Sequence, residues 1–239
     1  GPTEASRGIT VTVHHELYDG LPVLGKWLTV SNGTGRILTL DRFASERLAV
    51  VEAESAVDER TEIAWRTPPL TVLSDYMFKG MDVVTGNQVA SWHPDPEFKT
   101  QVSYALKTPC RLVCEPPIGP GIKLAPGETF TSFRTWLVIH DSTDRERQGL
   151  FIRHAHRALA PWSTESPVMM HVRNADTKSF RSAVDQCAEV GFEMIIYTFG
   201  SGLDVEKEDP AYIAKVRADV DYAHGKGIQV GAYSLCSSR

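Results

Sequence analysis

The stretch AEVGFEMIIYTFGSGLDVE, residues 188–206, decides the fold class of this chain. An apolar run from Phe192 to Tyr197 stops at the glycine-rich segment 200–202, after which the chain turns polar and acidic. A short apolar run that ends in glycines is typical of a buried parallel strand, and such strands deliver their carboxyl ends to a ligand in α/β folds. The sequence therefore predicts a strand here whose end lies at a ligand site.

The segments on either side of this strand repeat an alternation of strand and helix. Strands are predicted at PVMMHVR, residues 167–173, and at IQVGAYS, residues 228–234, and helices are predicted at 176–191 and 210–227. Phe180, Val184, Cys187 and Ala188 share one face of the first helix, and Ile213, Val216, Val220 and Ala223 share one face of the second. Strand, helix, strand, helix, strand is the beginning of a parallel α/β sheet.

Residues 9–141 carry a different pattern, with a period of two. ITVTVHHELYDG and LGKWLTVSN alternate apolar and polar residues, and the turn at 32–35 predicts a hairpin that joins the second of these to RILTLDRF. Further strands are predicted at 70–78, 98–106, 110–115 and 128–139. Alternating strands separated by polar turns are typical of an antiparallel β-sandwich.

A helix is predicted between these two patterns. Thr143 and Glu146 have the spacing of a capping box, and the helix can then continue to the stop at Ala160-Pro161. We therefore expect a β-sandwich domain at 1–141, a linker helix at 142–165 and an α/β domain at 166–239. Three strands cannot close a barrel of eight, so we expect the sequence to be the N-terminal part of a longer protein.

Composition excludes several classes of partner. A formal net charge of -5 and a pI near 5.9 argue against binding to nucleic acid, which requires a basic face. No apolar run approaches the roughly 18 residues that span a bilayer, so no membrane partner is predicted. The four cysteines are expected to be small buried side chains, without a metal cluster or a cofactor. The first residue is not methionine, and the compartment is left undetermined.

The segments AVDQCAEVGFEMIIYTFGSG, VDYAHGKGIQVGAYSL and HHELYDGLPVLGKWLTV, in this order of modules, resemble glycoside hydrolase family 36, the bacterial α-galactosidases and their relatives. The resemblance implies an N-terminal antiparallel β-supersandwich followed by the first strands and helices of an incomplete (β/α)8 TIM barrel. It also implies hydrolysis of terminal α-linked sugars with retention, through one Asp nucleophile and one Asp acid and base. In the family those acids come from later barrel strands, so the catalytic residues are expected beyond Arg239. The oligosaccharide substrate needs no metal or organic cofactor, and homo-oligomer contacts through the sandwich are left open.

The ends of barrel strands form the rim of the active site, and the resemblance therefore names candidate sugar contacts. These are His171 and Arg173 from the first strand, Tyr197, Thr198 and Ser201 from the second, and Tyr233 and Ser234 from the third. The family's usual Asp-Asp-Gly-Trp motif is replaced here by YTFGSG, which leaves a sugar other than galactose, or a divergent subfamily, as an alternative. A plain strand-to-helix turn is the alternative for the glycine-rich segment itself.

Two further functions fit the same sequence. The sandwich could recognise glycans as a binding or structural module without chemistry. The complete protein could also be a transglycosylating relative, similar to the raffinose and stachyose synthases, that passes the sugar to another acceptor.

Overall fold

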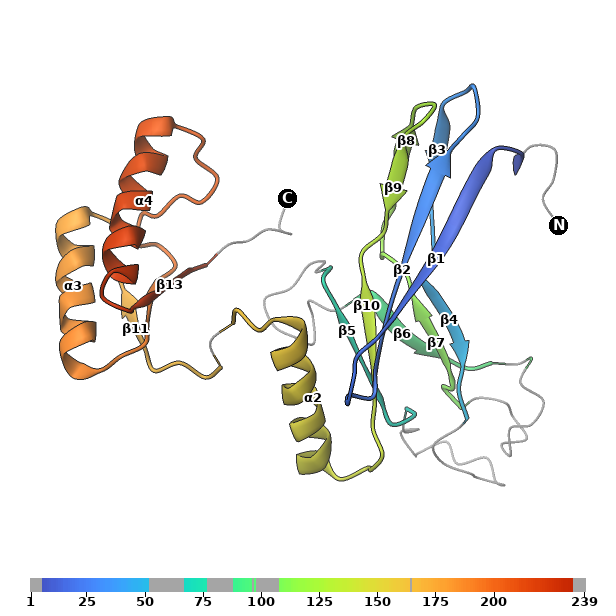
Figure 1. Ribbon diagram of the computed structural model, residues 1–239, viewed down its shortest axis with the longest axis horizontal. Coiled ribbons are helices and arrows are strands. Elements are labelled where there is room, and N and C mark those ends of the chain that lie inside the picture. The colour runs from blue at the N-terminus through green and yellow to red at the C-terminus, as the bar shows by residue number, and fades with distance from the viewer. Residues whose placement is uncertain are drawn as a thin grey trace. The chain divides into compact units, whose positions relative to one another are not determined.

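The computed structural model describes residues 6–51, 67–76, 88–95, 97, 108–163 and 165–233. The chain divides into two compact units, residues 1–160 and 161–237. The first unit is β-rich and the second alternates strands with helices, which confirms the predicted order of β-rich and α/β parts (Figure 1).

The strands of the first unit form two main sheets and a small ribbon, and all their pairings are antiparallel. The larger sheet has the order β1 (Ile9–Leu17), β2 (Val23–Asn32), β10 (Thr135–Ile139) and β5 (Leu70–Ser74), with β9 (Thr129–Thr131) also paired to β2. The second sheet has the order β4 (Glu46–Ala49), β7 (Arg111–Cys114) and β6 (Ala90–His93). The ribbon joins β3 (Leu38–Leu40) to β8 (Ile122–Leu124).

The core of the first unit lies between its two main sheets. Val72 and Leu137 from the larger sheet pack in one buried cluster with Leu112 and Cys114 from the smaller one. Alternation along each strand turns these side chains to the shared interior. Cys110, Cys114 and Cys187 are buried, as expected of small core residues, whereas Cys236 lies outside the described residues.

Helix α2 (Arg145–Leu159) packs on the first unit. Its Ala155 is fully buried against Val23 and Val138, with Phe151 beside them. The predicted capping box at Thr143 is wrong by one residue, because the carboxylate of Asp144 accepts the N–H of Arg147 at 2.8 Å. The first unit accordingly extends to Ala160, and α2 is grouped with it rather than standing as a separate linker.

The predicted hairpin between residues 24–32 and 36–43 is wrong. Both edges of β2 are already occupied, one by β1 and the other by β9 and β10, so β3 pairs with β8 instead. The buried amide of Asn32 directs the chain there, since its Nδ2 donates to the carbonyls of Arg36 at 2.8 Å and Leu124 at 2.9 Å.

Two other predicted strands are shorter than expected. The single strand predicted at 128–139 is divided into β9 and β10, because Ser132 inserts its hydroxyl and N–H between them to bond both backbone groups of Leu28. Strand β5 ends at Ser74, where the Ser74 hydroxyl accepts the N–H of Tyr76 in a turn. The strand predicted at 98–106 lies outside the described residues.

The second unit contains the predicted parallel sheet. Its strands are β11 (Met169–Val172), β12 (Met194–Tyr197) and β13 (Gln229–Ala232), and both pairings are parallel. Helix α3 (Thr177–Val190) begins at the N-cap Asp176 and ends at Gly191, which has φ 79°. Helix α4 (Pro210–His224) begins with Pro210 in its first turn after the N-cap Asp209.

Helices α3 and α4 pack on the same face of this sheet. Their core contains Phe180, Val184 and Cys187 from α3, Ala223 from α4, and Ile195 from β12. The predicted face of α3 is right except at Ala188, which is exposed. On α4 only Ala223 of the predicted apolar face is fully buried in this core; Val216 and Val220 are half-buried, Ile213 is 44% exposed, and the buried Asp219 lies beside Ala223.

Candidate functional site

The apolar run of β12 ends because the backbone must turn through left-handed conformations. Gly200 and Gly202 have φ of 80° and 85°, which side chains other than glycine rarely adopt. Between them, the carbonyl of Ser201 accepts the N–H of Ala175 at 2.9 Å, and its hydroxyl accepts the N–H of Leu203 at 3.4 Å. The turn therefore joins the loop after β12 to the loop after β11.

The predicted rim residues lie at the carboxyl edge of the sheet, with different degrees of exposure. Thr198 is half-buried and its N–H donates to the carbonyl of Val172 at 2.9 Å, while its hydroxyl donates to the carbonyl of Phe199 at 3.0 Å. Arg173 is exposed directly after β11. The rings of His171 and Tyr233 lie 6.0 Å apart between centroids, so the structure brings these two together. Ser234 lies outside the described residues.

One face of the parallel sheet has no helix on it among the described residues, and we call it the open face. It carries six strand residues, as the register and the alternation of side chains require: Met169, His171, Met194, Ile196, Gln229 and Gly231. His171 and Met169 are exposed, and Ile196 and Met194 are half-buried. At Gly231 an added Cβ would lie 3.2 Å from Cγ1 of Ile196, so glycine lets the neighbouring strand's side chain lie flat across β13.

Tyr197 is on the opposite face, which corrects its place among the predicted sugar contacts. Its ring stacks on Phe180 with centroids 4.7 Å apart and planes at 9°, and only 2% of the residue is exposed. Burial raises the pKa of its hydroxyl well above the ordinary value, and the nearby Asp219 carboxylate raises it further. Alternation alone explains the placement, because Tyr197 is one residue removed from Ile196 on the open face.

A groove of about 530 Å³ lies beside β13, which pairs only with β12 among the described residues, and we call it the edge groove. Its walls come from the loop after β12, from α4 and from β13, and most of them are apolar. The lining includes Leu203, Val205, Tyr212, Ile213, Val216, Val220 and Val230. The apolar face predicted for α4 therefore lines this groove instead of the core.

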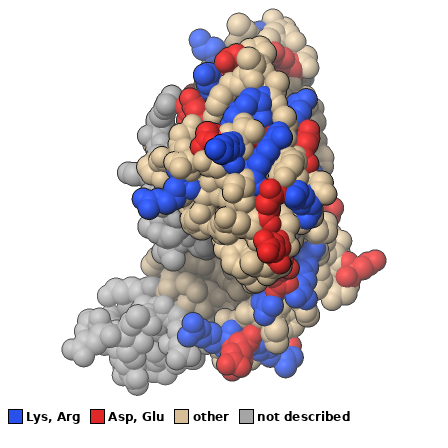
Figure 2. Space-filling model, turned by 90° about the vertical axis from the view of Figure 1, so that its left-hand side faces the viewer, with Lys and Arg blue, Asp and Glu red and all other residues tan. Residues whose placement is uncertain are grey.

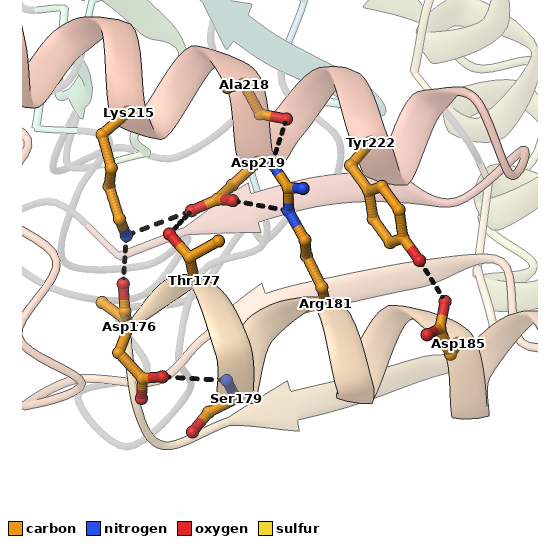
Figure 3. Close-up of polar contacts among 10 residues, drawn as sticks. Asp176, Thr177, Ser179, Arg181, Asp185, Lys215, Ala218, Asp219 and Tyr222 are labelled. Atoms are coloured by element: carbon orange, nitrogen blue, oxygen red, sulfur yellow. Dashed lines mark hydrogen bonds and ion pairs between the residues drawn. The ribbon is translucent and has the colours of Figure 1, made fainter.

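A buried carboxylate joins the two helices of the second unit (Figure 3). The side chain of Asp219, only 1% exposed, accepts from Nζ of Lys215 at 3.1 Å, Nε of Arg181 at 3.0 Å and Oγ1 of Thr177 at 2.9 Å. Lys215 also donates to the carbonyl of Ala175, which holds the loop after β11.

The charge state of Asp219 follows from these contacts. Burial by itself raises the pKa of this carboxyl, but the hydrogen bonds from Lys215, Thr177 and Arg181 outweigh it, and the pKa lies below the ordinary value. Asp219 is thus an ionised buried group. Sequence reasoning missed it, although an acid four residues after Lys215 on the inner side of a helix is a detectable signal.

A second, more polar recess of about 690 Å³ lies in the first unit, beside β1, β2 and β4. Lys26 and Glu46 form an ion pair at 2.8 Å within it, with side chains only 16% and 9% exposed. Arg42, Arg47 and Glu115 bring further charges to its lining, and Phe43 brings an aromatic ring. Sequence reasoning did not single out this recess, because its walls come from strands distant in the chain.

The open face, the edge groove and the polar recess carry groups suited to binding a ligand. The six strand residues of the open face include no Asp or Glu, so among the described residues this face offers no pair of facing acids. No group of three or more His, Cys, Asp or Glu side chains that could hold a metal ion occurs in the described part of the chain. Lys and Arg are interspersed with Asp and Glu on the face drawn in Figure 2. No helix within the described ranges has the length and apolar character needed to cross a bilayer.

The sequence was compared with known proteins. Neither the protein-family models nor the curated proteins include a match to this chain.

Proposed function

We propose that this chain is the N-terminal part of a retaining glycosidase that resembles glycoside hydrolase family 36 and acts on terminal α-linked sugars. The observation that carries the proposal is the one-sided covering of the parallel sheet: α3 and α4 pack on one face, and the open face has no helix on it among the described residues. Parallel sheets are ordinarily covered on both faces. In a (β/α)8 barrel the second face becomes the interior, and the edge groove beside β13 is where a further strand and helix would continue.

The rim of such a barrel assigns roles to the residues that the structure brings together. His171 and Tyr233 lie at the carboxyl edge, where an aromatic ring can pack on a sugar ring and polar atoms can bond its hydroxyls. Retaining hydrolysis requires two carboxylates about 5 Å apart across the sugar. The proposal places both on strands beyond Arg239, because the described residues of the open face supply neither.

The test compares the 239-residue chain with the product of its complete gene on a panel of nitrophenyl α-glycosides. We expect turnover only by the complete product, with the anomeric configuration retained when followed by NMR. Turnover by the 239-residue chain, or a complete product inactive on the whole panel, would contradict the proposal. A second sugar added as acceptor separates hydrolysis from transglycosylation, since only the latter yields a longer saccharide.

The role of the rim is tested in the same active protein. His171→Ala should raise KM for the preferred glycoside about tenfold, because it removes a ring at the carboxyl edge. His154→Ala is the matched control, as His154 is exposed on α2 in the other unit, and it should leave KM unchanged. An equal change of KM in both variants would show that His171 does not contact the substrate.

A non-catalytic glycan-binding module is the second candidate, and the polar recess favours it. The Lys26–Glu46 pair and Phe43 supply donors, an acceptor and a ring within one hollow. This function predicts that the 239-residue chain binds neutral oligosaccharides in calorimetric titrations and that Glu46→Gln weakens the binding. If the 239-residue chain gives no heat of binding and the complete gene product turns over a glycoside, the results favour the glycosidase.

A further inference from the structure

Strand β1 forms one edge of the larger sheet of the first unit (Figure 1), and half of its backbone groups point away from β2. The carbonyl of Gly8 accepts the N–H of Gly33 at 2.8 Å, and bonding direction alternates along an antiparallel strand. Even-numbered residues of β1 therefore bond to β2, whereas odd-numbered residues direct N–H and C=O outward. Leu28, opposite Val13, agrees with this pattern, because both its backbone groups bond Ser132 on the far side from β1.

No strand among the described residues pairs with the outward edge of β1, and the strand carries exposed apolar side chains. Val11, Val13 and Leu17 are 57%, 49% and 81% exposed. Natural edge strands are usually guarded by lysine, proline or a bulge, and the sequence ITVTVHHEL contains neither of those residues. Its nine residues pair with β2 without a bulge. Such an edge is suited to pairing with another strand.

We propose that β1 is a homodimer interface, in which β1 of a second copy pairs antiparallel with it about a two-fold axis at Val13. This register is the one in which all nine residues find a partner. The outward residues then meet as Val13 with Val13, Val11 with His15, and Ile9 with Leu17. Five such pairings close about ten backbone hydrogen bonds and bring the exposed apolar side chains together.

Charge complementarity selects a second copy as the occupant. Glu16 is the one acidic residue of β1, and this register places it opposite Thr10 of the other copy, so the two carboxylates do not face each other. Just beyond the strand ends, Arg7 of one copy lies level with Asp19 of the other, and both are exposed. The strand is thus complementary to itself, as a two-fold interface requires.

Sedimentation equilibrium of the 239-residue chain tests the interface. We expect a dimer for the unmodified chain and a monomer for Val13→Pro, since proline removes an outward N–H that the fold does not use. Val13→Thr keeps both the N–H and the β-branched shape, so it should remain dimeric. An unmodified chain that is monomeric at all concentrations, or a Val13→Pro chain that folds and still dimerises, would overturn the proposal.

Disulfide cross-linking tests the register without depending on the proline variant. In a Cys236→Ser background, Thr10→Cys with Glu16→Cys should give covalent dimers, because the two positions face each other about 4.5 Å apart across the axis. Within one chain they are about 20 Å apart, which prevents an internal bond. Thr10→Cys with Leu17→Cys places the thiols on opposite faces and should not cross-link. Equal cross-linking of both pairs, or of neither, would contradict the register.

Discussion

At the residue scale, the buried carboxylate of Asp219 links the two helices of the second unit. It is bonded by Lys215, Arg181 and Thr177, and so it joins α3 to α4. Buried charges stabilise a fold only when they are fully paired, and removal of one partner leaves the others without compensation. We therefore expect substitution of Asp219 to lower the free energy of unfolding, and we expect this effect to depend on pH.

Asp219→Asn should lower the free energy of unfolding of the second unit by about 3 kcal/mol at neutral pH, because two cations lose their buried counter-charge. The measurement is chemical denaturation followed by far-UV circular dichroism. Asp185→Asn is the control: Asp185 accepts from Lys226 and Tyr222 at the exposed surface, and its loss should change stability little. A larger effect at Asp185 would contradict the assignment.

The difference between the unmodified chain and Asp219→Asn should shrink in acid. The folded pKa of Asp219 lies below the ordinary value of 3.8, so the folded state binds its proton less readily than the unfolded state does. The stabilisation is present above pH 3.8 and is lost as the pH falls from there through the folded pKa. Denaturation curves of both proteins between pH 7 and pH 2.5 measure this, and a difference that grows in acid would refute the sign.

At the element scale, the two helices of the second unit use valine in different ways. Val184 of α3 is fully buried in the core, whereas Val216 of α4 lines the edge groove and is half-buried. Sequence periodicity predicts that both valines lie on the apolar face of their helices. The structure separates them because α4 rotates Asp219 and Ala223 toward the sheet.

Val184→Ala should cost about 2 kcal/mol of unfolding free energy, and Val216→Ala less than about 1 kcal/mol, because only the first opens a cavity in a packed core. Both variants make the same change, valine to alanine, within a helix of the second unit. Thermal denaturation of both measures the contrast. Equal losses would mean that the edge groove is closed in solution, for example by another part of a longer protein.

Two glycines on helices have opposite roles. Gly191 ends α3 with φ 79°, while Gly149 lies within α2, where an added Cβ would meet nothing within 4 Å. Gly191→Ala should destabilise by about 1 kcal/mol, and Gly149→Ala should stabilise by a similar amount through improved helix propensity. Melting temperatures of the single variants test the opposite signs, and two shifts in the same direction would contradict this reading of the backbone.

At the scale of the whole molecule, the chain contains two units with separate cores. Among the described residues, the first has clusters between its sheets and under α2, and the second has one cluster on one side of a three-stranded sheet. A small unit with a one-sided core buries less apolar surface per residue than a larger one. The second unit should therefore be the less stable.

Differential scanning calorimetry should show two transitions rather than one, with the second unit unfolding first. Asp219→Asn should move only the lower transition. Val138→Ala removes methyl groups from the fully buried position between β10 and α2, and it should move only the upper one. A single transition displaced by both variants would show that the units unfold together.

The sequence by itself determined the types and positions of the longer elements, because apolar periodicity and helix signals are local, but it did not predict the short strands β4, β6 and β8. The alternation of apolar and polar residues predicted β1 and β2. Asp176 and Gly191 marked the two ends of α3, and the apolar run before Gly200 predicted β12. The family resemblance and the function it implies stay predictions, since no catalytic acid is among the described residues of the open face.

Only the tertiary structure decided how these elements pair and which way their side chains face. A hairpin signal at 32–35 could not reveal that both edges of β2 are occupied, so β3 pairs with β8, from 80 or more residues away in the chain. One residue of strand register moves Tyr197 from the open face to the core, and about a third of a turn of helix rotation separates the buried Asp219 from the exposed Ile213. Local sequence is insensitive to such choices, because they depend on the surface area that distant segments bury together.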